Sequence, residues 1–121
     1  MLRGAPMTTE ERRIIFSDEE VVGAVKALYH RAKETFPPGN VWNVAISEDN
    51  GCQIDCDVVD AKGRRDRVTV AGERLAAALI LHCIMHKVPL PAKAQKALTI
   101  VQGKLALNIT LPGGPQKMIE V

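Results

Sequence analysis

Apolar residues recur every three or four positions between Asp18 and Thr35, which is the period of an amphipathic helix. Ser17 is placed to cap the start of this helix, and Glu20, three residues later, completes a capping box. Pro37 and Pro38 cannot continue a helix and mark its end. One face of the predicted helix carries the apolar residues Val21, Val22, Val25, Leu28, Tyr29, Ala32 and Phe36.

The next two segments, 41–48 and 52–59, alternate between apolar and polar residues, as strands with one buried face do. The residues expected to face inward are Trp42, Val44 and Ile46 in the first segment and Cys52, Ile54, Cys56 and Val58 in the second. A two-residue loop would put Ile46 opposite Asp55, whereas a three-residue loop puts Ile46 opposite Ile54. We therefore expect a three-residue loop, built on a type I turn with Gly51 left-handed.

A basic loop, residues 62–66, leads into a short third strand that carries Val68 and Val70 inward. The second helix is predicted over residues 72–87 and is apolar nearly all round, so it must be buried on more than one side. Two explanations fit this helix: it is the central helix of the monomer, or it forms part of a subunit interface.

The last part of the domain is predicted to be one short helical turn at residues 92–97 and a hairpin of strands 98–101 and 104–111. A two-residue loop at Gln102 and Gly103 sets Ile100 opposite Leu105 and Leu98 opposite Leu107, which keeps one face apolar.

The predicted order is helix, three strands, helix, two strands. This order indicates an α+β fold with a single five-stranded, mainly antiparallel sheet and two helices on one face. Residues 1–13 are expected to be a flexible leader, 14–111 the single domain, and 112–121 a loose tail. The other face of the sheet would be polar and solvated, with Asn43, Ser47, Gln53, Asp55, Asp57, Arg67, Thr69, Asn108 and Thr110.

Composition narrows the class of protein. The chain has 121 residues, 46% of them hydrophobic and 25% charged, with a formal net charge of +2. This balance is typical of a globular domain and by itself does not indicate nucleic-acid or membrane binding. The first residues lack the apolar core of a signal peptide, and the apolar run from Leu75 to Met85 is too short to span a bilayer. Three cysteines do not form a secreted disulfide framework, so we expect a cytoplasmic protein without membrane contact.

Two sets of residues could hold a metal ion. His82 and His86 share one helix face, next to Cys83, and resemble half of a zinc site. The H-E-x-x-H motif of metalloproteases is absent, because no Glu follows His82. The alternative is that His82 lies at the edge of the core and His86 in the solvated helix end.

Asp55 and Asp57 lie on one strand face, with Asp60 nearby, and paired carboxylates can bind magnesium. No general base or phosphate-binding glycine loop accompanies them, and exposed acids on a polar sheet face also serve solubility. Cys52 and Cys56 could supply thiolates to the same zinc ion as His82 and His86, but packing in the core is the favoured interpretation. They cannot form a disulfide with each other, because four strand residues separate their Cα atoms by about 13 Å.

The densest basic cluster comprises Lys62, Arg64, Arg65 and Arg67, which a phosphate backbone would attract. No aromatic residue interleaves with these charges, so base stacking is not indicated. A solvated hairpin loop is the favoured interpretation of the cluster.

No motif for a nucleophile elbow or a nucleotide-binding loop occurs in the chain, and no catalytic residue or cofactor is predicted. The function we expect is a small non-catalytic binding or regulatory module that acts through protein–protein contacts, with a second copy of the chain among the candidate partners. Two alternatives stay open: a nucleic-acid-binding protein that uses residues 62–67, and a metal-binding protein or metal-dependent hydrolase.

Overall fold

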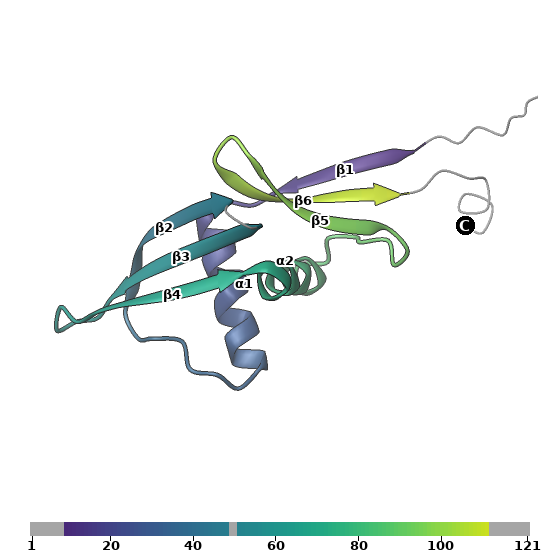
Figure 1. Cartoon of the computed structure of the whole chain (residues 1–121). Coiled ribbons are helices and arrows are strands. Elements are labelled where there is room, and N and C mark those ends of the chain that lie inside the picture. Colours follow the sequence, from purple (N-terminus) through teal and green to yellow (C-terminus); the bar gives the residue numbers. More distant parts are fainter. Residues whose placement is uncertain (1–8, 49–50, 112–121) are drawn as a thin grey trace, which may run out of the picture.

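The computed structural model describes residues 9–48 and 51–111. Two helices and six strands follow one another in this part of the chain (Figure 1), in the order β1 (Glu10–Ile15), α1 (Asp18–Arg31), β2 (Asn40–Glu48), β3 (Cys52–Val59), β4 (Arg65–Ala71), α2 (Gly72–Met85), β5 (Gln95–Val101) and β6 (Lys104–Leu111). The α+β class is confirmed.

The strands form two antiparallel three-stranded sheets, in the orders β2-β3-β4 and β1-β6-β5. The predicted single five-stranded sheet is therefore wrong. The reason lies in β6, which pairs with β5 on one side and with β1 on the other. With both of its edges paired, β6 completes a separate sheet and does not extend the first one. Figure 1 shows the two helices on one side of both sheets, near the place where the sheets meet.

Strand β1 is an element that the sequence pattern did not predict. Residues 10–13 of the expected leader belong to it, and Ile15 pairs with Ala106 at its far end. Its sequence, EERRII, shows no alternation of apolar and polar residues. Such alternation arises where one face of a strand is buried, whereas this strand has few buried side chains and is held mainly by backbone hydrogen bonds to β6. The guanidinium of Arg12 also donates to the carbonyl of Pro89 at 3.0 Å. Residues 1–8 of the leader and the expected tail 112–121 lie outside the described residues.

Helix α1 starts as predicted. The Ser17 hydroxyl accepts a hydrogen bond from the Glu20 N–H at 3.1 Å, and the Glu20 carboxylate accepts one from the Ser17 N–H at 2.9 Å. The helix ends at Arg31, earlier than the predicted Thr35, and Lys33 then takes a positive φ of 59°. Before the helix, Phe16 is buried and its N–H donates to the carbonyl of Leu105, which ties α1 to β6.

Both hairpin registers are confirmed. Ile46 pairs with Ile54 across β2 and β3, and Ile100 pairs with Leu105 across β5 and β6. Gly51 has a φ of 101°, as expected, while the turn residues 49–50 lie outside the described part of the chain. The helical turn predicted at 92–97 is wrong, because β5 already begins at Gln95.

The core lies between the inner sheet faces and the two helices. Leu75, Leu79, Leu81 and Cys83 of α2 are buried, and at 100° per residue they cover more than half of the helix circumference. This burial supports the central-helix explanation for α2 within the monomer. Within the described residues, no helix is both long and apolar enough to cross a membrane.

Candidate binding surface on the β2-β3-β4 sheet

Trp42 does not face inward, and this corrects the strand pattern predicted for β2. The register between β2 and β3 shifts between Val41 and Asn43, so Trp42 is an extra residue at a β-bulge. Val41 takes the place opposite Val58, and the Trp42 side chain is left 56% exposed. A signal for this bulge exists in the sequence: Val41 and Val44 are both apolar but three positions apart, which a strand of period two does not allow on one face.

Arg65, at the start of β4, lies beside Trp42. Its guanidinium carbon is 5.7 Å from the centroid of the Trp42 rings, within the range of a cation–π contact. Trp42 and Arg65 line a surface hollow of about 520 Å³ together with Asp57, Asp66 and Arg67. The bulge therefore joins an aromatic ring to the basic residues of β4, a combination that the strand pattern of the sequence did not predict.

Asp57 organises the neighbouring row of side chains. Asn43, Asp57 and Arg67 pair in register across the three strands. The Arg67 Nε donates to Asp57 Oδ1 at 2.7 Å, and the Asn43 Nδ2 donates to Asp57 Oδ2 at 2.9 Å. These hydrogen bonds, that of Arg67 first, lower the pKa of Asp57. The carboxylate therefore stays ionised at neutral pH and holds both neighbours in place.

The next row repeats this pattern, since the Thr69 hydroxyl donates to Asp55 at 2.6 Å. We call the whole surface the outer face, and its members are Trp42, Asn43, Gln53, Asp55, Asp57, Arg65, Arg67 and Thr69. Asn108, predicted to belong to it, lies on β6 in the other sheet instead.

The predicted basic cluster is divided between two places. Arg65 and Arg67 belong to β4 and the outer face, whereas Lys62 and Arg64 lie in the loop before it. The Asp60 carboxylate accepts hydrogen bonds from the N–H groups of Lys62 and Arg64, at 2.9 and 2.8 Å, and fixes this loop. The four basic residues thus stand close in sequence to four acids, Asp55, Asp57, Asp60 and Asp66.

The predicted metal ligands do not assemble into a site. The rings of His82 and His86 are in contact, with centroids 4.2 Å apart, and His82 Nε2 is 3.6 Å from Glu20 Oε2. Across residues 9–48 and 51–111, however, no group of three or more His, Cys, Asp or Glu side chains is arranged to hold a metal ion. Asp57 is also poorly suited to magnesium, because both of its carboxylate oxygens already accept protein hydrogen bonds.

The three cysteines are buried and unbonded, in agreement with packing in the core. Burial raises the pKa of each thiol, and for Cys56 the pKa is raised to about 11. The thiol form, which is a weak metal ligand, therefore predominates at neutral pH.

No protein-family model, no curated protein and no solved structure matches the chain. A function for this chain must therefore be inferred from the chemistry of the outer face.

Proposed function

We propose that the protein is a non-catalytic binding module and that its outer face binds another protein. The observation that carries this proposal is the half-exposed Trp42 beside Arg65, on a sheet face whose other side is covered by the core. Trp and Arg are the residue types most enriched among those that dominate binding energy at protein interfaces. The bulge presents both side chains at one hollow.

The charges of this region favour a protein partner over a polyanion. Lys62, Arg64, Arg65 and Arg67 are balanced by an equal number of aspartates, and the two closest charges, Arg67 and Asp57, are paired. A phosphate backbone requires an excess of positive charge. A protein partner can instead place an apolar group on the Trp42 ring and a carboxylate on Arg65, whose guanidinium makes no hydrogen bond to the described residues. The chemistry we expect of the partner is therefore an acidic side chain next to an apolar one.

The hydrogen bonds of Asp57 also support binding without catalysis. A general base must have an oxygen available to take a proton. Both oxygens of Asp57 are occupied by Arg67 and Asn43, so this carboxylate holds the shape of the surface.

Cross-linking in cells, followed by purification and quantitative mass spectrometry, tests the proposal. Proteins that are recovered with the wild type should be lost with Trp42→Ala and with Arg65→Ala. Lys104→Ala, which removes an exposed charge at the β5–β6 turn, is the matched control and should retain them. Identical recovery from the wild type and the Trp42 and Arg65 variants would refute the proposed site.

Nucleic-acid binding is the second candidate, because the Trp42–Arg65 contact supplies the aromatic group that such binding uses for stacking. It predicts binding of single-stranded oligonucleotides that weakens steeply with salt and is lost in Trp42→Ala. Absence of binding at low salt would exclude it.

A further inference from the structure

The four strands at the sheet edges differ in how they are protected from pairing with another chain. Natural edge strands are blunted by charged residues, especially lysine, by proline or by β-bulges. Strand β1 begins with four charged residues, β4 with three, and β5 contains Lys96. Strand β2 has no charged residue and no proline before Glu48, its last residue. Beyond the bulge at Trp42, residues 43–47 are therefore an unprotected edge, and Figure 1 shows β2 at the margin of its sheet.

The bulge at Trp42 restricts the regular part of this edge to residues 43–48, which keep an unbroken register with β3. An antiparallel partner strand must present side chains that point to the same sheet face at each pair. A second β2 satisfies this condition when Ala45 lies opposite its own copy, because Val44 then meets Ile46 and Asn43 meets Ser47. Centring the pairing on Val44 would keep only residues 43–45 paired within the regular part of the edge, whereas centring it on Ala45 keeps residues 43–47 paired.

Helix α1 borders the same edge. A groove of about 620 Å³ runs between α1 and β2, with Val22, Gly23, Val41 and Val44 among its lining residues. Gly23 is exposed, and a Cβ built on it would meet no atom within 4 Å, so another backbone can approach closely there. Near Gly23 the groove is lined by small and apolar residues, and Asn40, Trp42 and Asn43 also line its β2 side.

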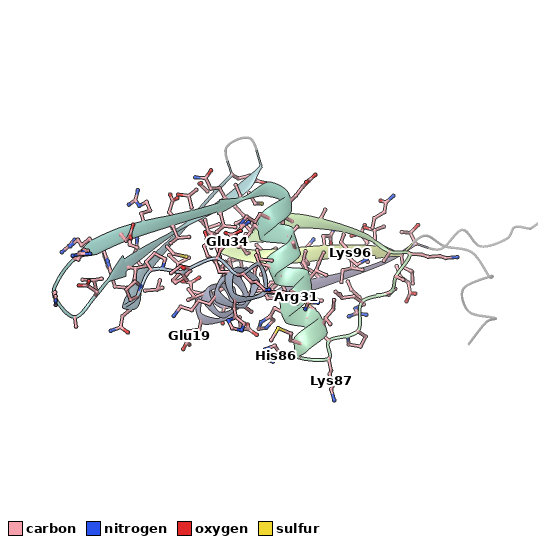
Figure 2. The ribbon with its side chains drawn as sticks, turned by 90° about the horizontal axis from the view of Figure 1, so that it is seen from below. Glu19, Arg31, Glu34, His86, Lys87 and Lys96 are labelled. Carbon is pink, nitrogen blue, oxygen red and sulfur yellow. The ribbon has the colours of Figure 1, made fainter. Side chains whose placement is uncertain are left out.

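Charge is arranged along this groove in a self-complementary way. Asp18 and Glu19 line one part of it and Lys26, about two helical turns further on, lines another. Figure 2 shows Glu19 projecting outward at the margin of the molecule. A twofold axis near Val22 and Gly23 sets two antiparallel copies of α1 side by side and brings Glu19 of each copy opposite Lys26 of the other. Such isologous matching is what a symmetric dimer requires.

We propose that the occupant of this groove is a second copy of the chain. Two β2 strands pair about Ala45 and join the sheets into one of six strands, while the two α1 helices meet beneath them. The unprotected edge supplies backbone hydrogen bonds, and the Glu19–Lys26 contacts fix the orientation. Trp42 and Asn43 line both this groove and the outer face, whereas Arg65 lines only the hollow of the outer face. The dimer would place two Trp42–Arg65 sites on one continuous sheet.

Sedimentation equilibrium of the full chain tests the dimer. Lys26→Glu alone and Glu19→Lys alone each set like charges against one another in both copies of the contact, so each should raise the dissociation constant by about tenfold or more. The double variant exchanges the two charges and should restore the wild-type constant. Thermal melts check that every variant is folded, because Lys26 also lies 5.5 Å from the centroid of the Phe36 ring.

A second pair of variants tests the strand. Ala45 is exposed, so Ala45→Lys leaves the monomer folded but sets two lysines against each other at the twofold axis. The matched control is Ala97→Lys, at an exposed position on the edge strand β5, which should leave the dimer unchanged.

A chain that stays monomeric at every concentration overturns the proposal, as does a dimer that none of the Lys26, Glu19 and Ala45 variants weakens. A monomer would leave the β2 edge to a peptide strand of another protein. A dimer that these variants do not weaken would have its interface elsewhere on the chain. Neither result changes the Arg65-dependent recovery of partners, because Arg65 does not line the α1–β2 groove, so the two proposals fail separately.

Discussion

Among the glycines in the described part of the chain, Gly39 is the one at which an added methyl group should cost the fold most. It precedes β2 with a φ of +118°, and a Cβ built on it would lie 2.2 Å from the carbonyl oxygen of Val59 and 2.8 Å from the Cα of Asp60. Both are backbone atoms, which cannot move aside as the end of a flexible side chain can. Since Asn40 pairs with Val59, relief of the clash must push the start of β2 away from β3.

The magnitude for Gly39→Ala has two parts. The left-handed conformation alone costs a residue with a side chain about 1–2 kcal/mol. Overpacking against fixed atoms adds about 1–3 kcal/mol. The sum of about 2–5 kcal/mol is a large share of the roughly 5–15 kcal/mol by which domains are stable.

Gly63→Ala provides the matched control. Gly63 also has a positive φ, of +81°, but a Cβ on it would meet nothing within 4 Å, so only the conformational cost of about 1–2 kcal/mol should appear. Urea unfolding followed by circular dichroism measures the free energy of unfolding of both variants. Equal losses at Gly39 and Gly63 would refute the close approach of β2 to the end of β3.

Three further predictions concern hydrogen bonds and protonation. Ser17→Ala and Glu20→Ala should each lower the free energy of unfolding by about 1 kcal/mol. The double variant should lose less than the sum, because the two side chains form one capping box. Thermal melts in which the two losses of stability add fully would contradict this. The pKa of Asp57 is lowered in the folded state, so its stabilising contribution is present above the unfolded pKa and is lost as the pH falls through the folded pKa. Asp57→Asn should therefore lose less stability in acid than the wild type does. Identical stability profiles in acid would count against the ion pair of Asp57 with Arg67. The pKa of Cys56 is raised to about 11, so its contribution to stability is present below the unfolded pKa of the thiol and is lost as the pH rises through about 11. Cys56→Val should therefore unfold less readily in alkali than the wild type does. An unchanged stability profile in alkali would show that the thiol is not buried.

Part of the outer face could be predicted from the sequence. Alternation in 52–59 identified Asp55 and Asp57 as residues of one polar face, and alternation near Val68 added Arg67 and Thr69. Trp42 could not be placed in this way, because the bulge that turns it outward changes the pattern by a single residue. Its contact with Arg65 joins residues that are 23 positions apart and depends on β4 pairing with β3.

The sequence by itself determined the local features of this protein: the capping box of α1, the registers of both hairpins and the burial of α2 on more than one side. These features follow from side chains a few residues apart, where helical and strand periods, loop length and capping chemistry act directly. Only the tertiary structure decided that β6 pairs with β1, that the strands divide into two sheets, and that the β2 edge stays open beside α1. These pairings are made by backbone hydrogen bonds between segments that are distant in the sequence. Since nearly every residue can make such bonds, the sequence of side chains does not predict which strands pair.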